Sequence, residues 1–193
     1  MYDKVYSPTT RSMAMELSGK SIAIFVENNY QEMEVWYPIF RFQEGGAEVS
    51  IIGPLAGRYL SKLGYPVVAD TQADMAKGKL FDALIIPGGF APDLMRLSSE
   101  MVEMVGHHVE KGRVVAAICH GSWMLASANA IRGKRVTGAP SIKDDLNNAG
   151  GHYEDAEVVC DGNLITSRKP SDLPAFCRAI VSALASASLR VAA

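Results

Sequence analysis

The stretch Val114-Val115-Ala116-Ala117-Ile118-Cys119-His120-Gly121 joins a run of apolar residues to a cysteine, a histidine and a glycine. The apolar run has the length and composition of a strand buried on both faces, and the helix-compatible residues 122–126 follow directly. We therefore expect Cys119 to lie in a sharp corner between a strand and a helix. A residue in such a corner is held in a strained backbone conformation, with its side chain exposed above the edge of the sheet.

Cys119 is a candidate nucleophile in this setting. The start of the following helix offers unpaired N–H groups and a partial positive charge, which favour a thiolate over a thiol. His120 could carry a proton, and Gly121 would keep the corner sterically open. A cysteine that follows an apolar run is often a buried structural residue, and this is the alternative interpretation. The strand, corner and helix together favour the nucleophile.

Apolar runs and helical patterns alternate along the rest of the chain. This alternation predicts a parallel sheet covered by helices on both sides, an α/β flavodoxin-like three-layer sandwich with a mostly parallel central sheet and a cysteine nucleophile elbow. The Gly- and Pro-rich segment 53–69 is expected to form an irregular arm or a hairpin. Strands are expected at 21–26, 49–52, 83–86, 114–118, near Val136, at 158–160 and at 164–166, and helices at 31–43, 92–110, after Gly121 and at 173–184.

Length and composition indicate one globular domain. The chain has 193 residues, of which 48% are hydrophobic and 21% charged, and its formal net charge is −2. We divide it into an N-terminal extension (1–19), a single domain (20–188) and a C-terminal tail (189–193). The charge gives no reason to expect nucleic acid or an anionic membrane as a partner. No apolar run approaches the ~20 residues that span a bilayer.

The cysteines and the N-terminus suggest a cytoplasmic protein. The three cysteines, Cys119, Cys160 and Cys177, are widely spaced, which fits a reducing compartment better than a set of disulfides. The first 19 residues do not read as a secretion signal. Neither a Cys-x-x-Cys nor a His-x-x-x-His spacing occurs, so no metal site is expected.

Three distant segments should meet at one cleft. In a parallel sheet, ligands gather at the carboxyl ends of the strands, and residues 27–34, 87–89 and 119–121 all leave from such ends. Gly88 and Gly89 could form a plain turn, or their N–H groups could join that of His120 in an oxyanion pocket facing Cys119. Glu34 could be part of this site, or it could simply favour the helix start and face water.

Other polar residues are expected to have structural or solvated positions. Neighbours in sequence at a tight corner often point apart, so Cys119 and His120 need not form a hydrogen bond. We expect His107, His108 and His152 to be solvated, and Asp144 and Asp145 to cap a helix.

The chain resembles the ThiJ/PfpI superfamily, in particular its intracellular protease I branch, which is related to glyoxalase III and to the parkinsonism-associated deglycase. The similarity runs from about Lys20 to Ala185 and therefore covers most of the chain. The motifs that carry it are Ala117-Ile118-Cys119-His120-Gly121, Tyr30-Gln31-Glu32-Met33-Glu34 with Tyr37-Pro38, Phe81-Asp82-Ala83-Leu84-Ile85-Ile86-Pro87-Gly88-Gly89, Ile142-Lys143-Asp144-Asp145 with Asn148-Ala149-Gly150, and 166–176.

The resemblance implies roles for several of these residues. Glu34 matches the family carboxylate that hydrogen-bonds the elbow cysteine, and its pKa would be raised by the nearby thiolate, so it could hold and donate a proton. The family pairs through surfaces near the active-site cleft, which implies a homodimer or higher homo-oligomer with the 53–69 arm as a plausible contact. No cofactor is implied.

The chain also departs from the family pattern. Gln31 stands where protease I proteins usually carry a Glu, and no acid stands in the 78–80 segment that would match the triad Glu supplied by a neighbouring subunit. Ser122-Trp123 replaces a Pro and a small or polar residue, so the indole of Trp123 could narrow the substrate pocket. These departures weaken the case for a proteolytic triad.

Three functions remain in competition. The first is a cofactor-free cysteine enzyme that acts on small carbonyl compounds, with Cys119 as nucleophile and Glu34 or His120 as proton carrier. The second is a cysteine hydrolase of peptide or amide bonds. The third is a redox sensor or chaperone whose thiol is oxidised reversibly without turnover. No sequence feature identifies the substrate.

Overall fold

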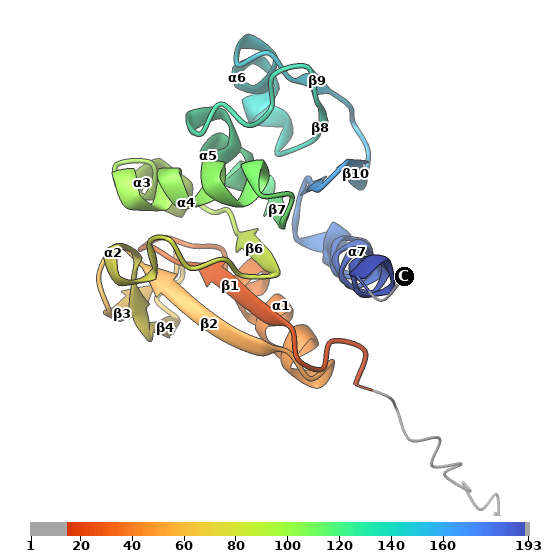
Figure 1. Ribbon diagram of the computed structural model, residues 1–193. Coiled ribbons are helices and arrows are strands. Elements are labelled where there is room, and N and C mark those ends of the chain that lie inside the picture. The colour runs from red at the N-terminus through yellow and green to blue at the C-terminus, as the bar shows by residue number, and fades with distance from the viewer. Residues whose placement is uncertain (1–14, 192–193) are drawn as a thin grey trace, which may run out of the picture.

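The computed structural model describes residues 15–191, which form a three-layer α/β sandwich (Figure 1). Its central sheet has seven strands in the order β10-β11-β7-β6-β1-β2-β5. All neighbouring strands in this sheet run parallel except β10, which pairs antiparallel with β11 at one edge. The predicted flavodoxin-like, mostly parallel sheet is therefore confirmed. Its strands are β1 (Ser21–Phe25), β2 (Glu48–Gly53), β5 (Thr71–Gln72), β6 (Ala83–Ile86), β7 (Val114–Ile118), β10 (Val158–Asp161) and β11 (Leu164–Ser167).

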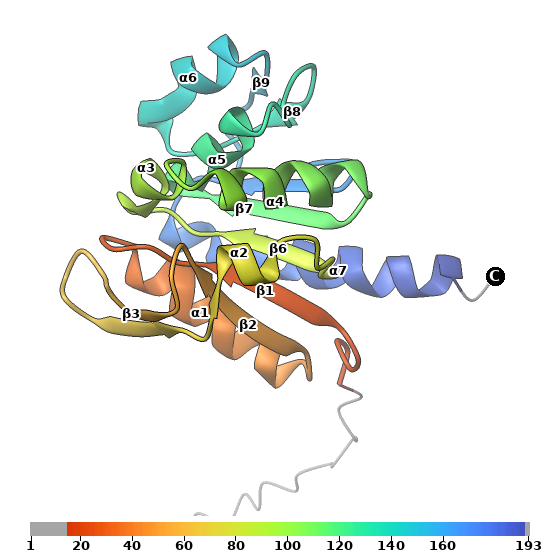
Figure 2. The ribbon, with the colours of Figure 1, turned by 60° about the vertical axis from the view of Figure 1, so that its left-hand side comes forward.

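Helices cover both faces of this sheet (Figures 1 and 2). Helices α1 and α7 contact each other on one face, whereas α2 and α4 contact each other on the opposite face. The helices are α1 (Glu32–Glu44), α2 (Ala73–Ala76), α3 (Ala91–Met95), α4 (Ser99–Glu110), α5 (Ser122–Ser127), α6 (Lys143–Asn148) and α7 (Leu173–Val191), with single 3-10 turns η1 (Cys119–Gly121), η2 (Pro140–Ile142) and η3 (Pro170–Asp172).

The central strands read as continuous apolar runs because both of their faces are covered. Every residue of β6 and of β7 is buried, as are four of the five residues of β1. Helix α1 shows the complementary pattern, since Val35, Ile39 and Phe42 are buried at helical spacing while Met33 and Phe40 are exposed. The spacing of apolar residues in the sequence therefore matches the pattern of buried residues in the strands and the helix that build the core.

The arm at 53–69 is a hairpin outside the central sheet. Its strands β3 (Gly57–Leu60) and β4 (Pro66–Ala69) pair antiparallel, which confirms one of the two predicted forms. A second small sheet pairs β8 (Arg135–Val136) with β9 (His152–Tyr153). The strand expected near Val136 therefore exists, and it pairs within this small sheet.

Several predicted boundaries were wrong. The single helix expected at 92–110 is two helices, because the Ser98 side chain accepts a hydrogen bond from Met101 N–H and starts α4 afresh. Residues 1–14 of the expected extension lie outside the described residues, but Leu17 is fully buried and its N–H donates to Gly45 O at 2.8 Å. The expected tail at 189–193 begins inside α7, which continues to Val191.

The strand order places the topological switch point of the sheet between β1 and β6. From β1 the chain first adds β2 on one side and later adds β6 on the other, so the connections leave in opposite directions. The loops after β1, β6 and β7 lie at this switch point, and they carry the three segments that were expected to meet.

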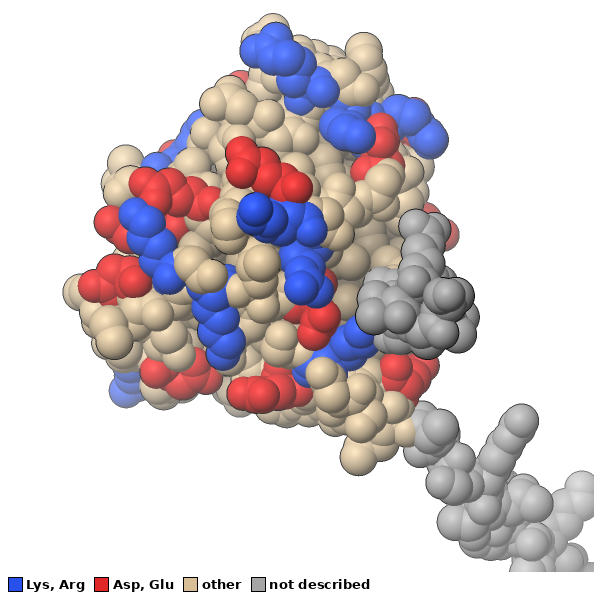
Figure 3. Space-filling view, in the orientation of Figure 1, with Lys and Arg blue, Asp and Glu red and all other residues tan. Residues whose placement is uncertain are grey.

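The surface carries both signs of charge. On the face shown in Figure 3, Lys and Arg side chains are interspersed with Asp and Glu, in keeping with a net charge of −2. Within residues 15–191, no helix combines the length and apolar character required to cross a membrane.

Candidate active site

Cys119 occupies the predicted corner. It follows β7 directly, begins the turn η1 and has a φ of 61°, a left-handed conformation that non-glycine residues rarely adopt. Gly121 permits the corner because a Cβ there would lie 2.2 Å from Ile86 O. Helix α5 starts at the next residue. The cysteine elbow expected from the sequence is therefore confirmed as a backbone feature.

Glu34 lies in the first turn of α1 and points into the protein. The Gln31 side chain accepts a hydrogen bond from Glu34 N–H at 3.1 Å and so caps this helix. The carboxyl of Glu34 is fully buried, and its Oε2 accepts from Gly88 N–H at 2.7 Å. A Cβ on Gly88 would lie 2.7 Å from Cys119 Cβ and 2.8 Å from Glu34 Oε2. The alternative in which Glu34 faces water is wrong.

The carboxyl and the thiol perturb one another. Burial raises the pKa of Glu34 to about 7, although the Gly88 N–H and the Cys119 thiol partly oppose this rise. Burial, together with the charge of Glu34, raises the pKa of Cys119 to about 12. The low thiol pKa expected from the helix start is therefore not found, and burial is the main reason. Once Glu34 holds a proton, the repulsion is gone and its O–H can donate to the sulfur.

Two backbone N–H groups approach the sulfur. The N–H groups of Gly89 and His120 hydrogen-bond Cys119 and lower its pKa against the effect of burial. Gly89 has a φ of 78°, and a Cβ there would lie 2.5 Å from Asn29 O, so the turn requires glycine. The N–H of Gly88 is already bonded to Glu34. Of the three N–H groups predicted to form an oxyanion pocket, those of Gly89 and His120 contact Cys119, whereas that of Gly88 bonds Glu34.

His120 contacts the cysteine, although neighbours at such a corner need not form a hydrogen bond. Its Nδ1 lies 3.2 Å from Cys119 Sγ, and its Nε2 lies 3.2 Å from Ser141 Oγ on η2. Burial lowers the pKa of His120, and the positive charge of Lys62 adds to that effect. His120 is thus a neutral ring that is hydrogen-bonded at both nitrogens.

Trp123 packs beside this histidine. Its ring meets the His120 ring edge-on with centroids 5.1 Å apart, and its Nε1 donates to Asp145 Oδ2 at 2.8 Å. Helix α6 has no side-chain cap, so the expected capping role of Asp145 is wrong. Asp145 instead holds the indole in place beside His120.

Sequence reasoning missed Ser141, Phe90 and Lys62. Phe90 lies across the His120 ring, with centroids 6.5 Å apart. Lys62 sits in the hairpin turn, which is held to the site by a bridge from Tyr30 to Ser61 and a second bridge from Tyr30 to Gly89. A lysine between two strands and a serine in a turn carry no pattern that marks a site. Their roles depend on contacts across the fold.

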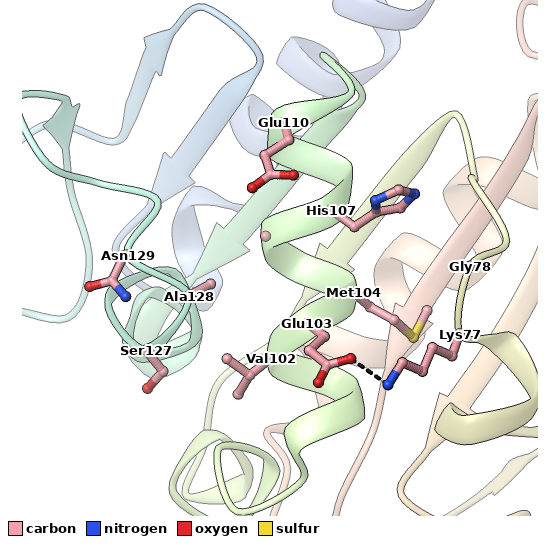
Figure 4. Close-up of a pocket in the computed structure, with 11 residues that line it drawn as sticks. Lys77, Gly78, Val102, Glu103, Met104, His107, Glu110, Ser127, Ala128 and Asn129 are labelled. Atoms are coloured by element: carbon pink, nitrogen blue, oxygen red, sulfur yellow. Dashed lines mark ion pairs between the residues drawn. The ribbon is translucent and has the colours of Figure 1, made fainter.

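A separate cavity of about 500 Å³ lies beside α4 and contains no residue of this cluster (Figure 4). Lys77 and Glu103 form an ion pair at its edge, with Nζ and Oε2 2.5 Å apart. Its lining consists of Lys77, Gly78, Val102, Glu103, Met104, Gly106, His107, Glu110, Ser127, Ala128 and Asn129. Among the residues that the structure describes, no cluster of three or more His, Cys, Asp or Glu could hold a metal ion.

Known proteins share both the sequence and the fold. The DJ-1/PfpI family matches residues 20–183, which is most of the chain. The chain belongs to the DJ-1/PfpI family. A deglycase of Pyrococcus horikoshii is 41% identical over 163 residues, covering 84% of this chain and 98% of that protein. The cysteine-protease candidate YraA of Bacillus subtilis is 41% identical over 161 residues, covering 83% and 95%. Drosophila melanogaster DJ-1beta superposes with a TM-score of 0.81 at 30% identity, covering 86% and 90%.

Membership of the DJ-1/PfpI family agrees with the ThiJ/PfpI resemblance carried by the sequence motifs. Relatives in this family bear the names of enzymes, and those names differ in the reaction they state. The choice between the reactions therefore depends on the site of this chain.

Proposed function

We propose that this protein is a cysteine-dependent enzyme that acts on small carbonyl compounds such as methylglyoxal, in the manner of a glyoxalase III or a deglycase, without a cofactor. One observation carries the proposal. The Cys119 thiol lies between a buried carboxyl with a pKa of about 7 and a histidine ring, so it has a proton carrier on each side. The deglycase name of the P. horikoshii relative supports the same substrate class.

The chemistry begins with addition of Cys119 Sγ to the aldehyde carbon. The C=O electron pair moves to oxygen, where the Gly89 and His120 N–H groups can stabilise the charge, and a proton from Glu34 or His120 completes a hemithioacetal. In an α-oxoaldehyde, the ionised Glu34 could then take the C–H proton and return it to the neighbouring carbon. This shift oxidises the aldehyde carbon and reduces the ketone carbon, so no external oxidant is needed. Water finally releases a hydroxy acid from the thioester.

A cysteine hydrolase is the second candidate. The Sγ–Nδ1 distance of 3.2 Å between Cys119 and His120 favours it, because a base in hydrogen-bond contact with the nucleophile is what acyl transfer requires. The name of YraA points in the same direction. In this chain the third member of the arrangement is Ser141, which carries no charge to stabilise an imidazolium ion.

A substrate comparison tests the proposal. Wild type, Cys119→Ala and the control Cys160→Ala are incubated with methylglyoxal, glyoxal and fluorogenic peptides. We expect consumption of the dicarbonyls by wild type and Cys160→Ala, and a loss of at least about 100-fold in Cys119→Ala, as befits removal of a covalent nucleophile. Peptide cleavage without dicarbonyl consumption would favour the hydrolase.

We also propose that the protein is a homodimer. An apolar surface spans α1 and the hairpin turn, where Phe40 is 62% and Leu63 is 81% exposed around a hollow of about 670 Å³. Trp36 packs within it against Phe40 and Tyr65, with ring centroids 5.5 and 5.7 Å away. An exposed aromatic cluster of this kind is typical of protein interfaces, and the hairpin turn that carries Lys62 joins this surface to the active site.

A cytoplasmic location forms part of the same proposal. Cys119, Cys160 and Cys177 are all free thiols. Free thiols are typical of proteins that work in a reducing compartment. The catalytic use of Cys119 also requires that it stay reduced.

A further inference from the structure

The His120 ring is held between two separate parts of the fold. Cys119, at the end of β7, contacts Nδ1, and Ser141, in the turn before α6, contacts Nε2. The Ser141 turn is itself fastened to the elbow, because Ala139 N–H donates to Cys119 O at 3.0 Å and the Tyr153 hydroxyl donates to Gly138 O at 3.3 Å. The serine therefore has a fixed position relative to the sulfur.

The position of the ring proton decides whether His120 can accept a proton from the thiol. A neutral imidazole has one N–H donor and one acceptor. Sγ keeps its proton while Glu34 is ionised, and His120 can take this proton only if its Nδ1 carries none. Nε2 then carries the ring proton, and this N–H donates a hydrogen bond to Ser141 Oγ. In the opposite tautomer Nδ1–H would be a donor and could not take the thiol proton.

The surroundings of the ring support this assignment. Phe90 and Trp123 pack against the ring, and burial lowers its pKa, so the neutral form prevails. The charged or titratable groups that face this region are Glu34 on α1, which lies at the sulfur, Lys62 in the hairpin turn, Asp145 on α6 and Arg96 after α3. The last two act through Trp123, since Asp145 bonds its Nε1 and Arg96 lies over its ring.

We propose that Ser141 is a positioning residue. Its hydroxyl oxygen accepts a hydrogen bond from Nε2–H of His120 and so keeps Nδ1 free to take the proton of the Cys119 thiol. The S–H bond breaks, its electron pair stays on sulfur, and the proton forms the Nδ1–H bond. The Nε2–H bond to Ser141 persists throughout and helps to disperse the positive charge of the ring. After Sγ adds to an electrophile, the Nδ1 proton is available to the new oxyanion.

The groups on the two sides of the sulfur therefore activate the thiol in different pH ranges. Below about pH 7 Glu34 is protonated and can stabilise the thiolate directly. Above that pH Glu34 is charged and opposes ionisation of the thiol, so activation depends on His120 and Ser141. The inference rests on the proposed nucleophilic role of Cys119 but not on the carbonyl substrate.

The test measures Cys119 alkylation by iodoacetamide from pH 5.5 to 9, resolved from the other thiols by peptide mass analysis. Wild type is compared with Ser141→Ala, Ser141→Thr and a control, Ser99→Ala, at an exposed serine on α4. Loss of one hydrogen bond worth about 1 kcal/mol should slow alkylation about fivefold in Ser141→Ala, and only above pH 7. Ser141→Thr should restore the rate, and both Ser99→Ala and the rate at Cys160 should match wild type.

Two further measurements keep the proposal falsifiable. In a His120→Asn background, Ser141→Ala should produce no additional loss, because serine acts only through the ring. Nitrogen NMR of the wild type should show His120 protonated at Nε2 near pH 8. A ring protonated at Nδ1, an equal loss at every pH, or an unchanged Ser141→Ala profile would overturn the proposal. If alkylation behaves as expected and methylglyoxal is not consumed, the substrate proposal fails while the role of Ser141 stands.

Discussion

The Gly88 backbone N–H donates to Glu34 Oε2 at 2.7 Å, and Gly88 O accepts from Gln31 N–H at 3.2 Å, so two bonds tie the loop after β6 to the start of α1. The carboxyl is thus positioned by main chain rather than by another flexible side chain. Its other oxygen, Oε1, is buried and has no conventional hydrogen-bond partner within residues 15–191. A buried carboxylate oxygen without a donor favours the protonated form, which agrees with the raised pKa of Glu34.

Glu34→Gln should weaken the dependence of stability on pH. Because burial raises the folded-state pKa of Glu34 from 4.5 to about 7, the folded protein binds more protons than the unfolded chain between these values. Stability should therefore fall as pH rises from 4.5 to 7, by up to about 3 kcal/mol for this group. Gln keeps the acceptor for Gly88 and cannot ionise, so urea unfolding at several pH values should show a flatter profile.

The control for this experiment is Glu44→Gln, which removes an exposed carboxylate from the other end of α1. Its profile should follow the wild type. In Glu34→Gln the pH dependence of Cys119 alkylation should also change, since the repulsion between the two groups has gone. A wild-type alkylation profile in Glu34→Gln would mean that the carboxyl does not govern the thiol.

The three thiols should differ in how they respond to alkylation. Cys177 is buried in α7 and should stay unlabelled in the native protein, because burial also raises its pKa to about 12. Cys160 is exposed on the edge strand β10, so it should label with a simple rise toward alkaline pH. Only the Cys119 profile should change in Glu34→Gln. If Cys177 in the native protein were labelled as fast as Cys160, α7 would have to open in solution.

The elbow and the sheet could be predicted from sequence because each rests on a local pattern. The run Val114–Ile118 can be recognised as apolar without knowing what packs against it, and its continuity and length identify a buried strand. The break between α3 and α4 was missed, although Ser98 carried a readable capping signal. The central cluster could be expected, since carboxyl ends of neighbouring parallel strands must meet.

The distances within the cluster could not be predicted in this way. Ser141 reaches His120 only because Ala139 is bonded to the Cys119 carbonyl, and no local pattern records that contact. The sequence also could not predict whether the pKa of the Cys119 thiol is raised or lowered. A helix start suggested a thiolate, but burial and the charge of Glu34 outweigh it.

His108 was expected to be solvated, and its burial makes the protein sensitive to acid. Its Nε2 accepts from Phe81 N–H at 3.1 Å and its Nδ1 donates to Met104 O at 2.7 Å, a pattern available only to the neutral ring. Burial lowers the pKa of His108, with smaller contributions from His107 and Arg113. Stability should therefore fall as pH drops below about 6.5, where the unfolded chain takes up the proton more readily.

His108→Asn should destabilise the protein by about 1–3 kcal/mol at pH 7.5, as expected when buried hydrogen bonds are lost. It should also remove part of the stability loss between pH 6.5 and 5. The matched control is His152→Asn at an exposed position on β9, which should change neither quantity. Equal pH profiles in wild type and His108→Asn would assign the acid sensitivity to other groups.

Phe40→Glu should separate the proposed dimer. The substitution places a charge on the apolar surface of α1 without entering the core, because Phe40 is exposed in the single chain. Light scattering should give about twice the 20.8 kDa chain mass for wild type and a value near 20.8 kDa for the variant. Met75→Glu, at an exposed apolar residue on α2, is the control and should leave the mass unchanged. A wild-type mass near one chain at micromolar concentration would contradict the dimer.

Peptide cleavage should be weak relative to turnover of small carbonyl compounds. Amide hydrolysis needs a proton for the leaving amine and a base for the attacking water on the acyl-enzyme. His120 contacts Cys119 and could supply the first, but its partner Ser141 has no charge with which to stabilise the imidazolium ion, and Gln31 is a helix cap that cannot titrate. Addition of Cys119 to an aldehyde involves no leaving amine, and the proton it needs can come from Glu34, whose pKa of about 7 suits transfer near neutrality. In parallel assays, wild type should consume methylglyoxal in a Cys119-dependent manner while casein and amidomethylcoumarin peptides stay largely intact. Efficient, Cys119-dependent peptide cleavage with no consumption of methylglyoxal would reverse this ranking.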